Sequence, residues 1–204
     1  MKILLTGFEP FGEEKRNPSW EVLKLLPDTI GEAELIKRCI PVEYQKCGDV
    51  LEEIFEKEKP DAVICLGQAG GRTKITPEFI AVNAMDAAGA DNVGTKYAGE
   101  RIIFDGSAAY ETTLPVRQMV EKMQEASIPA GLSYTAGAYV CNNLMYRLLH
   151  MLDEKGLKIP AGFIHIPFDE KQALAGGARP FMPLNMMAEG ISICIGLVAE
   201  KAQN

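Results

Sequence analysis

The stretch AVICLGQAGGR, residues Ala62 to Arg72, carries the clearest fold signal in the sequence. Its first five residues form an unbroken apolar run, which is typical of a parallel strand buried on both faces. Glycines follow at once, which indicates that the chain turns out of the sheet near Gly67. Because sheets of such strands are covered by helices on both sides, the stretch predicts an α/β protein.

The rest of the chain alternates in the same way, with short apolar runs between longer amphipathic segments. No repeat, low-complexity segment or linker interrupts this pattern. It predicts one α/β domain over residues 1–204 with a mostly parallel central sheet. The further strands expected are Lys2–Thr6, Ala33–Ile40, Phe79–Asn83, one near Gly131–Tyr134, and Ala161–Ile166. The helices expected are Ser19–Leu26 with Ser19 as N-cap, Tyr44–Lys57, Leu114–Ala126, Tyr139–Lys155 and Leu184–Lys201.

Composition and charge limit the partners of this chain. Its 204 residues are 47% hydrophobic and 24% charged, and the formal net charge is −7. An acidic chain without a lysine or arginine cluster disfavours nucleic acid and anionic membranes as partners. The apolar run after Met1 is too short for a signal peptide, and no run of about 18 apolar residues follows. We therefore expect a cytoplasmic protein that binds no nucleic acid and no membrane.

The five cysteines are odd in number and irregularly spaced, so they predict neither a disulfide framework nor a zinc site. Cys39, Cys65 and Cys194 lie in apolar runs that suit small buried residues, and Cys47 suits an inert helix position. Cys141 differs because it falls in the first turn of a predicted helix, where unpaired N–H groups favour a negative charge and can lower the pKa of a thiol. It is a candidate nucleophile, and a small buried residue is the alternative.

Few side chains are available as partners for that thiol. His150 lies nine residues further along the same predicted helix, a rise of about 13 Å, which is too far for direct contact. His165 ends a predicted strand, at the sheet edge where α/β proteins bind ligands. Glu78, beside apolar residues after the glycine-rich loop, is a candidate to orient that imidazole. Taken singly, His165 also fits a strand histidine bonded to the backbone, and Glu78 an ordinary surface residue.

Two loops at the same predicted edge suggest a small binding pocket. GFEPFG, Gly7–Gly12, puts Phe8 and Phe11 on a loop, where they either pack beneath it or wall an apolar pocket. GQAGGR, Gly67–Arg72, lacks the spacing and the lysine of the phosphate-binding loops, which disfavours a nucleotide. We expect it to form a tight turn that lets backbone groups approach a substrate.

Together, GFEPFG with NPSW, GQAGGR with ITPE and AVN, SYTAGAYVCN and GFIHIPF resemble the pyroglutamyl peptidase I (pyrrolidone-carboxylate peptidase) family in order and spacing. The resemblance spans Met1 to about Phe168. It implies a cytosolic cysteine peptidase with a three-layer α/β/α fold that removes an N-terminal pyroglutamyl residue from peptides through a thioacyl-enzyme intermediate. It also implies that no metal or cofactor is needed, and that the chain forms a homo-oligomer, a tetramer or a dimer.

The resemblance assigns roles position by position. It implies Cys141 as nucleophile, His165 as general base and Glu78 as the residue that orients it. The flat lactam ring would lie between apolar walls, with its polar edge paired, so that proline would be rejected for its missing carbonyl. The substrate-binding residues implied are Phe8, Phe11, Asn17, Gln68, Tyr139 and Val140.

Two positions depart from the family pattern. Phe79 stands where a basic residue usually follows the glutamate, and residues 83–88 read NAMDAA in place of NxxDAR, so Ala88 replaces an arginine. Loss of one oxyanion donor lowers turnover by about 10²–10³. Three candidates could replace the missing oxyanion donor: the side chain of Arg72, the side chain of Arg101, or the backbone N–H groups near Cys141. Two alternatives to a pyroglutamyl peptidase therefore remain: a Cys-His-Glu amidohydrolase that acts on another small amide or lactam, and a non-catalytic homologue. Because the triad is intact, the sequence favours an enzyme over a non-catalytic homologue.

Overall fold

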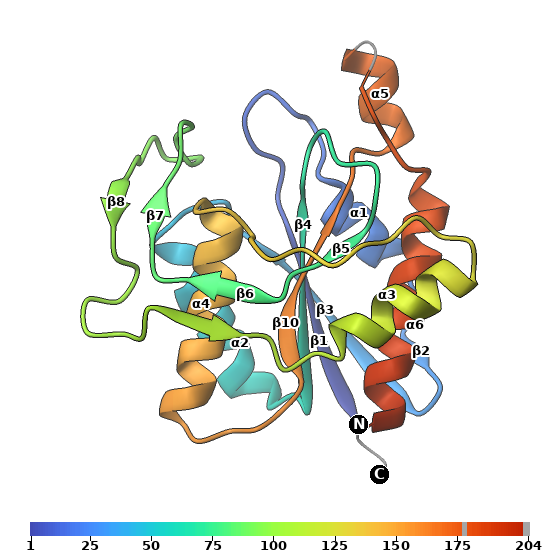
Figure 1. Cartoon of the computed structure of the whole chain (residues 1–204), viewed down its shortest axis with the longest axis horizontal. Helices are drawn as coiled ribbons and strands as arrows, with labels where there is room; N and C mark the ends of the chain where they lie inside the picture. Colours follow the sequence, from blue (N-terminus) through green and yellow to red (C-terminus); the bar gives the residue numbers. More distant parts are fainter. Residues whose placement is uncertain (177–178, 202–204) are drawn as a thin grey trace.

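A six-stranded sheet forms the centre of the protein, in the order β2–β3–β1–β4–β10–β5 (Figure 1). The computed structural model describes residues 1–176 and 179–201. Neighbouring strands are parallel except at the two edges, where short strands run antiparallel to the sheet. The parallel strands are β1 (Lys2–Phe8), β3 (Ala33–Ile40), β4 (Ala62–Gln68) and β10 (Ala161–Ile166), and the edge strands are β2 (Thr29–Ile30) and β5 (Thr76–Pro77).

Helices cover both faces of this sheet, which makes the predicted three layers (Figure 1). One face carries α1 (Pro18–Leu25), α3 (Val116–Glu125) and α6 (Leu184–Lys201), and the other carries α2 (Lys46–Glu58) and α4 (Val140–Glu154). None of the helices in the described part of the chain is both long and apolar enough to cross a membrane.

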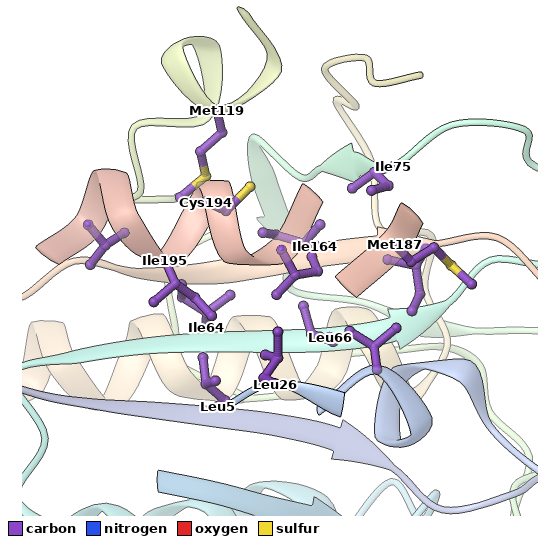
Figure 2. Packing of buried hydrophobic residues seen from close by; sticks show 14 of the residues in the cluster. Leu5, Leu26, Ile64, Leu66, Ile75, Met119, Ile164, Met187, Cys194 and Ile195 are labelled. Carbon is purple, nitrogen blue, oxygen red and sulfur yellow. The ribbon is translucent and has the colours of Figure 1, made fainter. Parts of the chain in front are cut away.

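Each face of the sheet has its own apolar core. Successive residues of a strand point to opposite faces, so Leu4 and Val63 pack on the α2–α4 side, and Leu5 and Ile64 on the α1–α3–α6 side. Figure 2 shows the second of these cores, where Ile64 lies between the sheet and the helix that carries Ile195. All seven residues of β4 are buried, because helices cover both of its faces. The prediction from AVICL is thus confirmed.

Two small antiparallel sheets and a short helix complete the fold. β6 (Ile80–Val82) pairs with β9 (Ala109–Glu111), and β7 (Met85–Asp86) pairs with β8 (Ala98–Glu100). Buried Asn142 of α4 accepts from the N–H of Val82 at 2.9 Å and donates to its carbonyl at 2.8 Å, so β6 is bonded to α4. The expected strand at Phe79–Asn83 therefore exists as β6 but lies outside the main sheet. Helix α5 (Glu170–Gly176) follows β10.

The predicted first helix began one residue too late, and its predicted N-cap was two residues too late. Helix α1 begins at Pro18, and Asn17 is the N-cap, with its Oδ1 accepting from the Ser19 N–H at 3.1 Å. Proline suits the first helical position because the N–H it lacks would be unpaired there. The Ser19 hydroxyl instead donates to Asn17 Oδ1 at 2.8 Å and accepts from the Phe8 N–H at 2.9 Å. It therefore joins the helix start to the end of β1.

The strand predicted near Gly131–Tyr134 was also wrong, because only isolated bridges form there. Ile75 pairs with Ala130 and Glu78 with Ser133, both in parallel. The Gly131 N–H bonds to the Ile75 carbonyl at 3.0 Å and the Ser133 N–H to the Pro77 carbonyl at 3.0 Å. Between these bonds a regular ladder needs an N–H from position 77, which proline lacks. The ladder is therefore interrupted.

Candidate active site

Distant segments of the chain meet where the parallel strands end. The loops after β1 and β4 reach the same side of the molecule as the start of α4 (Figure 1). His165 is the fifth of six residues in β10, and its Cα pairs with Gly67 near the end of β4. Because the parallel strands end at one edge of the sheet, the residues predicted to form the site lie together at this edge.

Glu78 and His165 form a buried pair at this edge. Glu78 Oε1 lies 2.7 Å from His165 Nδ1, and the two side chains are 0% and 5% exposed. The backbone brings them together because Thr76 of β5 pairs with His165 of β10, and the Glu78 N–H bonds to the Phe163 carbonyl at 2.9 Å. A carboxylate only accepts hydrogen bonds, so Nδ1 carries the hydrogen and Nε2 is the free base.

Burial, hydrogen bonds and nearby charges together set the protonation of this pair. It lowers the pKa of His165, an effect that the bond and charge of Glu78 oppose and that the charge of Arg72 reinforces. For Glu78, burial acts to raise the pKa, but the bond and charge of His165, with Ser133 and Arg72, outweigh it and leave the pKa below its usual value. The imidazole is therefore neutral and the carboxylate ionised near pH 7.

Cys141 is the second residue of α4, and its thiol lies against Gly67. A Cβ added to Gly67 would be 3.0 Å from Cys141 Sγ and 2.6 Å from Phe163 Cζ, so only glycine lets the thiol come this close to β4. No side-chain hydrogen bond caps the start of α4, whose N-cap is Tyr139. The first N–H groups of the helix are thus available to a developing negative charge beside the thiol.

The start of the helix is not the dominant influence on the pKa of Cys141. Burial, the largest influence, raises the pKa of the thiol to about 12, with Cys47 and Glu78 adding to it and Arg72 and the Cys141 N–H opposing it. Cys141 nevertheless stays partly accessible from the pocket. Among the described residues, no hydrogen bond joins its Sγ to His165, a contact that in such sites often closes only with substrate. The resting site thus pairs a neutral thiol with a neutral imidazole.

A small pocket opens at the Cys141 thiol. The empty space between its lining residues is about 280 Å³ even with open solvent at the mouth included, which suits one small group rather than a long side chain. None of its lining residues carries a charge at pH 7. They are Phe8, Phe11, Asn17, Val42, Gln68, Tyr139, Val140 and Cys141, so all six residues expected to bind substrate line it and Val42 was missed.

The aromatic side chains that wall this pocket are positioned by contacts with other residues of the protein. The Phe11 ring lies 6.3 Å from that of Tyr139, and the Tyr139 hydroxyl donates to the Ala90 carbonyl at 2.8 Å. Phe8 is 2% exposed, with its ring 6.3 Å from Phe163. Both alternatives left open by the sequence thus apply to Phe8, which is buried and also walls the pocket.

Comparison with known proteins agrees with this geometry. The profile of the pyroglutamyl peptidase family matches residues 1–201.

The chain belongs to the pyroglutamyl peptidase family.

Among its relatives, the pyrrolidone-carboxylate peptidase of Thermococcus kodakarensis is 47% identical over 200 residues, 98% of this chain and 97% of the relative. That of Streptococcus suis is 46% identical, over 98% and 93%. The crystal structure of Bacillus amyloliquefaciens pyroglutamyl peptidase I superposes with a TM-score of 0.93 at 42% identity, covering 98% of this chain and 97% of that one. A mutant pyrrolidone carboxyl peptidase from Pyrococcus furiosus gives 0.95 at 41% identity, over 98% and 99%. These solved structures confirm the predicted fold class for this member of the pyroglutamyl peptidase family.

Gln172 is a buried glutamine that was not predicted from the sequence, and it supports the pocket. Gln172 Nε2 donates to Gln68 Oε1 at 2.8 Å and to Glu14 Oε2 at 3.0 Å, which links β4 to the loop after β1. Gln172 and Asp169 also exchange reciprocal side-chain to backbone bonds, at 2.9 Å and 3.2 Å. That is a capping box, and the spacing Asp-x-x-Gln in DEKQ was the signal that could have predicted α5.

The side chain of Asn17 is already engaged within the protein. Its Oδ1 caps α1, and its Nδ2 donates to the Glu9 carbonyl at 2.9 Å, so the residue fixes the shape of the GFEPFG loop. Asn17 is 2% exposed. One Nδ2 hydrogen is left for a ligand once these bonds are counted.

The position of the missing family arginine lies on the surface. Ala88 is exposed, and so is Arg101, which donates to the Phe104 carbonyl at 2.8 Å. Arg72 is the candidate that reaches the site, with Nη1 2.8 Å from Glu78 Oε1. Phe79, at the other departure from the family pattern, packs its ring 5.5 Å from that of Tyr134.

The remaining candidates behave mostly as expected. His150 lies away from the thiol, with its Nδ1 3.0 Å from the Tyr110 hydroxyl. Cys47, Cys65 and Cys194 are buried, but Cys39 is exposed, which corrects its prediction. Cys39 stands in the half of β3 that β2 does not pair, at the edge of the sheet. Within residues 1–176 and 179–201, no three His, Cys, Asp or Glu side chains gather as ligands for a metal ion.

Proposed function

We propose that this chain removes the N-terminal pyroglutamyl residue from peptides, with Cys141 as nucleophile, His165 as general base and Glu78 as the residue that orients His165. One observation carries the proposal. The Cys141 thiol lies in the wall of a small uncharged pocket and against Gly67, the residue that pairs with His165 of the buried Glu78–His165 pair. Membership of the pyroglutamyl peptidase family over nearly the whole chain favours this substrate over another small amide.

The pocket suits a lactam because it offers no counter-charge. A free N-terminal ammonium would lose its water there without gaining a carboxylate, which costs several kcal/mol. A pyroglutamyl ring is neutral and flat, so it loses little by entering between Phe8, Phe11 and Tyr139. Backbone groups at Gln68 and the remaining Nδ2 hydrogen of Asn17 pair its polar edge in this proposal. Substrates that leave those groups unpaired bind less well.

The first half of the reaction forms a thioester. His165 Nε2 takes the proton of the Cys141 thiol as Sγ attacks the pyroglutamyl carbonyl, and a tetrahedral oxyanion results. The uncapped N–H groups at the start of α4 stabilise that oxyanion, in place of the arginine side chain absent at Ala88. The carbon–nitrogen bond then breaks, and the imidazolium gives its proton to the departing amine.

The second half releases the product. His165 takes a proton from water, the resulting hydroxide attacks the thioester carbonyl, and the carbon–sulfur bond breaks. The proton returns to Sγ, which restores the neutral thiol, and pyroglutamate leaves. Glu78 stays ionised throughout and stabilises the imidazolium that forms twice in the cycle.

Three wider properties belong to the same proposal. We propose that residues 1–204 form a single catalytic domain. We propose a cytoplasmic location, which the five free cysteines support. We also propose a homo-oligomer, a tetramer or a dimer, which light scattering at several protein concentrations will test. The exposed Leu174 of α5 and Phe181 suit such an interface.

A panel of fluorogenic amides tests the activity. Pyroglutamyl, prolyl and alanyl amides are compared under reducing conditions with the wild-type protein, Cys141→Ser and Cys39→Ser. We expect turnover of the pyroglutamyl amide alone, lost in Cys141→Ser and kept in Cys39→Ser, because Cys39 lies outside the site. Equal turnover of the prolyl amide would disprove lactam recognition. Activity in Cys141→Ser would disprove the thiol mechanism.

A further inference from the structure

Arg72 contacts the same carboxylate oxygen as the general base. Its Nη1 donates to Glu78 Oε1 at 2.8 Å, and His165 Nδ1 lies 2.7 Å from that oxygen. The two nitrogens are therefore at most 5.5 Å apart, the sum of those two distances. Glu78 is fully buried, whereas the Arg72 side chain is 32% exposed, so a cation enters the site from the solvent side.

The same guanidinium joins three segments around the site. It donates to the Thr76 hydroxyl beside the strand of His165, and to the Thr135 carbonyl at 3.4 Å. Thr135 begins the TAGA turn that leads into α4 and Cys141. Arg72 itself ends the GQAGGR loop after β4. A planar fork with five donors suits such a position, where a lysine would make fewer contacts.

We propose that Arg72 is a positioning residue for this reaction, which fixes Glu78 against His165 and sets the charge balance of the Cys141–His165 pair. The inference rests on the proposed function of that pair. It assigns Arg72 no contact with the substrate.

The sign of the effect follows from its positive charge. A cation beside His165 disfavours the imidazolium and so lowers the pKa of the ring, whereas it favours the thiolate and so lowers the pKa of Cys141. Removing the charge therefore raises both pKa values. The range of pH in which the pair holds one proton in total moves to higher pH, whichever of the two groups carries that proton.

The other charged and titratable groups around the pair are few. Glu78 and Arg72 act on His165, and Glu78, Arg72 and Cys47 of α2 act on Cys141. Tyr44 and Tyr139 also face the thiol, and burial raises the pKa of both phenols, so they are neutral near pH 7. Cys47 is neutral near pH 7, because burial raises its pKa to about 12. Arg72 is therefore the cation whose removal tests the proposal.

The experiment compares Arg72→Gln, Arg72→Lys and Arg101→Gln with the wild-type protein. Arg101→Gln removes the same charge at an exposed site away from the pair and serves as the matched control. The first readout is kcat/KM against pH with the pyroglutamyl amide. We expect the acid limb of Arg72→Gln to move up by about one pH unit, which lowers activity about tenfold on the acid side. Arg72→Lys keeps the charge, so its limb stays near that of the wild type.

The second readout needs no substrate. The rate of Cys141 alkylation by iodoacetamide is followed against pH by peptide mass spectrometry, with exposed Cys39 as an internal standard. At pH 8.5 we expect Arg72→Gln to react about tenfold more slowly at Cys141, relative to Cys39, because less thiolate is present. Thermal melting checks that each variant is folded.

The outcomes separate the inference from the proposed function. Suppose that Cys141 of Arg72→Gln is alkylated more slowly but that even the wild-type protein turns over none of the amides. This result would support the role of Arg72 in the charge balance and would disprove the peptidase proposal. Lower activity in Arg72→Gln with an unmoved acid limb and unchanged alkylation overturns the inference, since Arg72 is then only structural. Unmoved profiles at full activity overturn it as well. So does a shift in Arg101→Gln as large as that in Arg72→Gln.

Discussion

Helices α1 and α4 both begin beside the pocket, yet their first turns are completed in opposite ways. Helix α1 has Pro18 in its first position and the Asn17 side chain as cap. Helix α4 has no side-chain cap, although Cys141 lies one residue into it. The capped start of α1 holds the pocket loop in shape, whereas the uncapped start of α4 leaves N–H groups for the oxyanion of the proposed reaction. Stability and chemistry are thus divided between two helix ends.

The largest predicted effect tests whether the uncapped start of α4 is sufficient to activate the thiol. We expect His165→Gln to lower kcat/KM by about 10³ or more, because burial keeps the Cys141 thiol protonated and only His165 can take its proton. His150→Gln is the matched control and should keep wild-type activity, because His150 contacts Tyr110 outside the pocket. Near-normal turnover in His165→Gln would mean that the helix start alone ionises the thiol.

A second pair of variants adds a side-chain cap at the start of α4. Tyr139→Asn and Tyr139→Asp both lose the ring of the N-cap residue and both supply a capping oxygen, but only aspartate adds a negative charge. We expect kcat of the aspartate variant to be about tenfold lower than that of the asparagine variant, because its charge opposes the oxyanion. Equal kcat values in the two variants would show that the charge develops elsewhere.

The role of the capped start of α1 is tested by measuring the free energy of unfolding. Asn17→Ala removes the cap of α1 and should lower the free energy of unfolding by about 1 kcal/mol, or Tm by about 2–4 °C. KM should rise as well, since Asn17 also bonds to Glu9 in the pocket loop. Asn17→Asp retains the capping oxygen and should recover most of the stability in a urea titration. If both variants unfold like the wild type, the cap contributes nothing.

The smallest effect concerns the acid limb of the wild-type protein. The proposed mechanism needs the neutral imidazole, and burial lowers the pKa of His165 below the usual 6.5. Activity should therefore persist as the pH falls through 6.5 and be lost only at the lower pKa. A kcat/KM profile between pH 4 and 8 measures it. A midpoint above 6.5 would mean that the charge of Glu78 outweighs burial.

The main sheet and its helices were predictable because their signals are local. Buried strands such as β4 and amphipathic helices such as α4 show in the periodicity of their own residues. The interrupted ladder at Gly131–Tyr134 was not predictable in this way, because it depends on Pro77, which is more than 50 residues earlier in the sequence. The cap of α1 is readable from Asn17-Pro18, because proline favours the first helical position, although Ser19 is also a residue type that caps helices.

The residues of the site were predictable by type and place, but their electrostatics were not. The sequence put Cys141 at a helix start, which taken alone lowers the pKa of a thiol. It could not reveal that burial outweighs this effect, or that the contact with β4 requires Gly67. The contact of Arg72 with Glu78 and the links of Gln172 to the pocket also depend on the folded arrangement. Such contacts join positions far apart in the chain.

The neutral resting thiol also affects how the protein withstands oxidants. Peroxides attack the thiolate, and a cysteine that is almost wholly protonated near pH 7 offers very little of it. Cys141 should therefore form sulfenic acid slowly while it waits for substrate. In the proposed mechanism its nucleophilic form arises only during the reaction, when a bound acyl group is positioned to consume it. Protection from oxidative damage and catalytic reactivity then do not conflict, because they belong to different moments of one cycle.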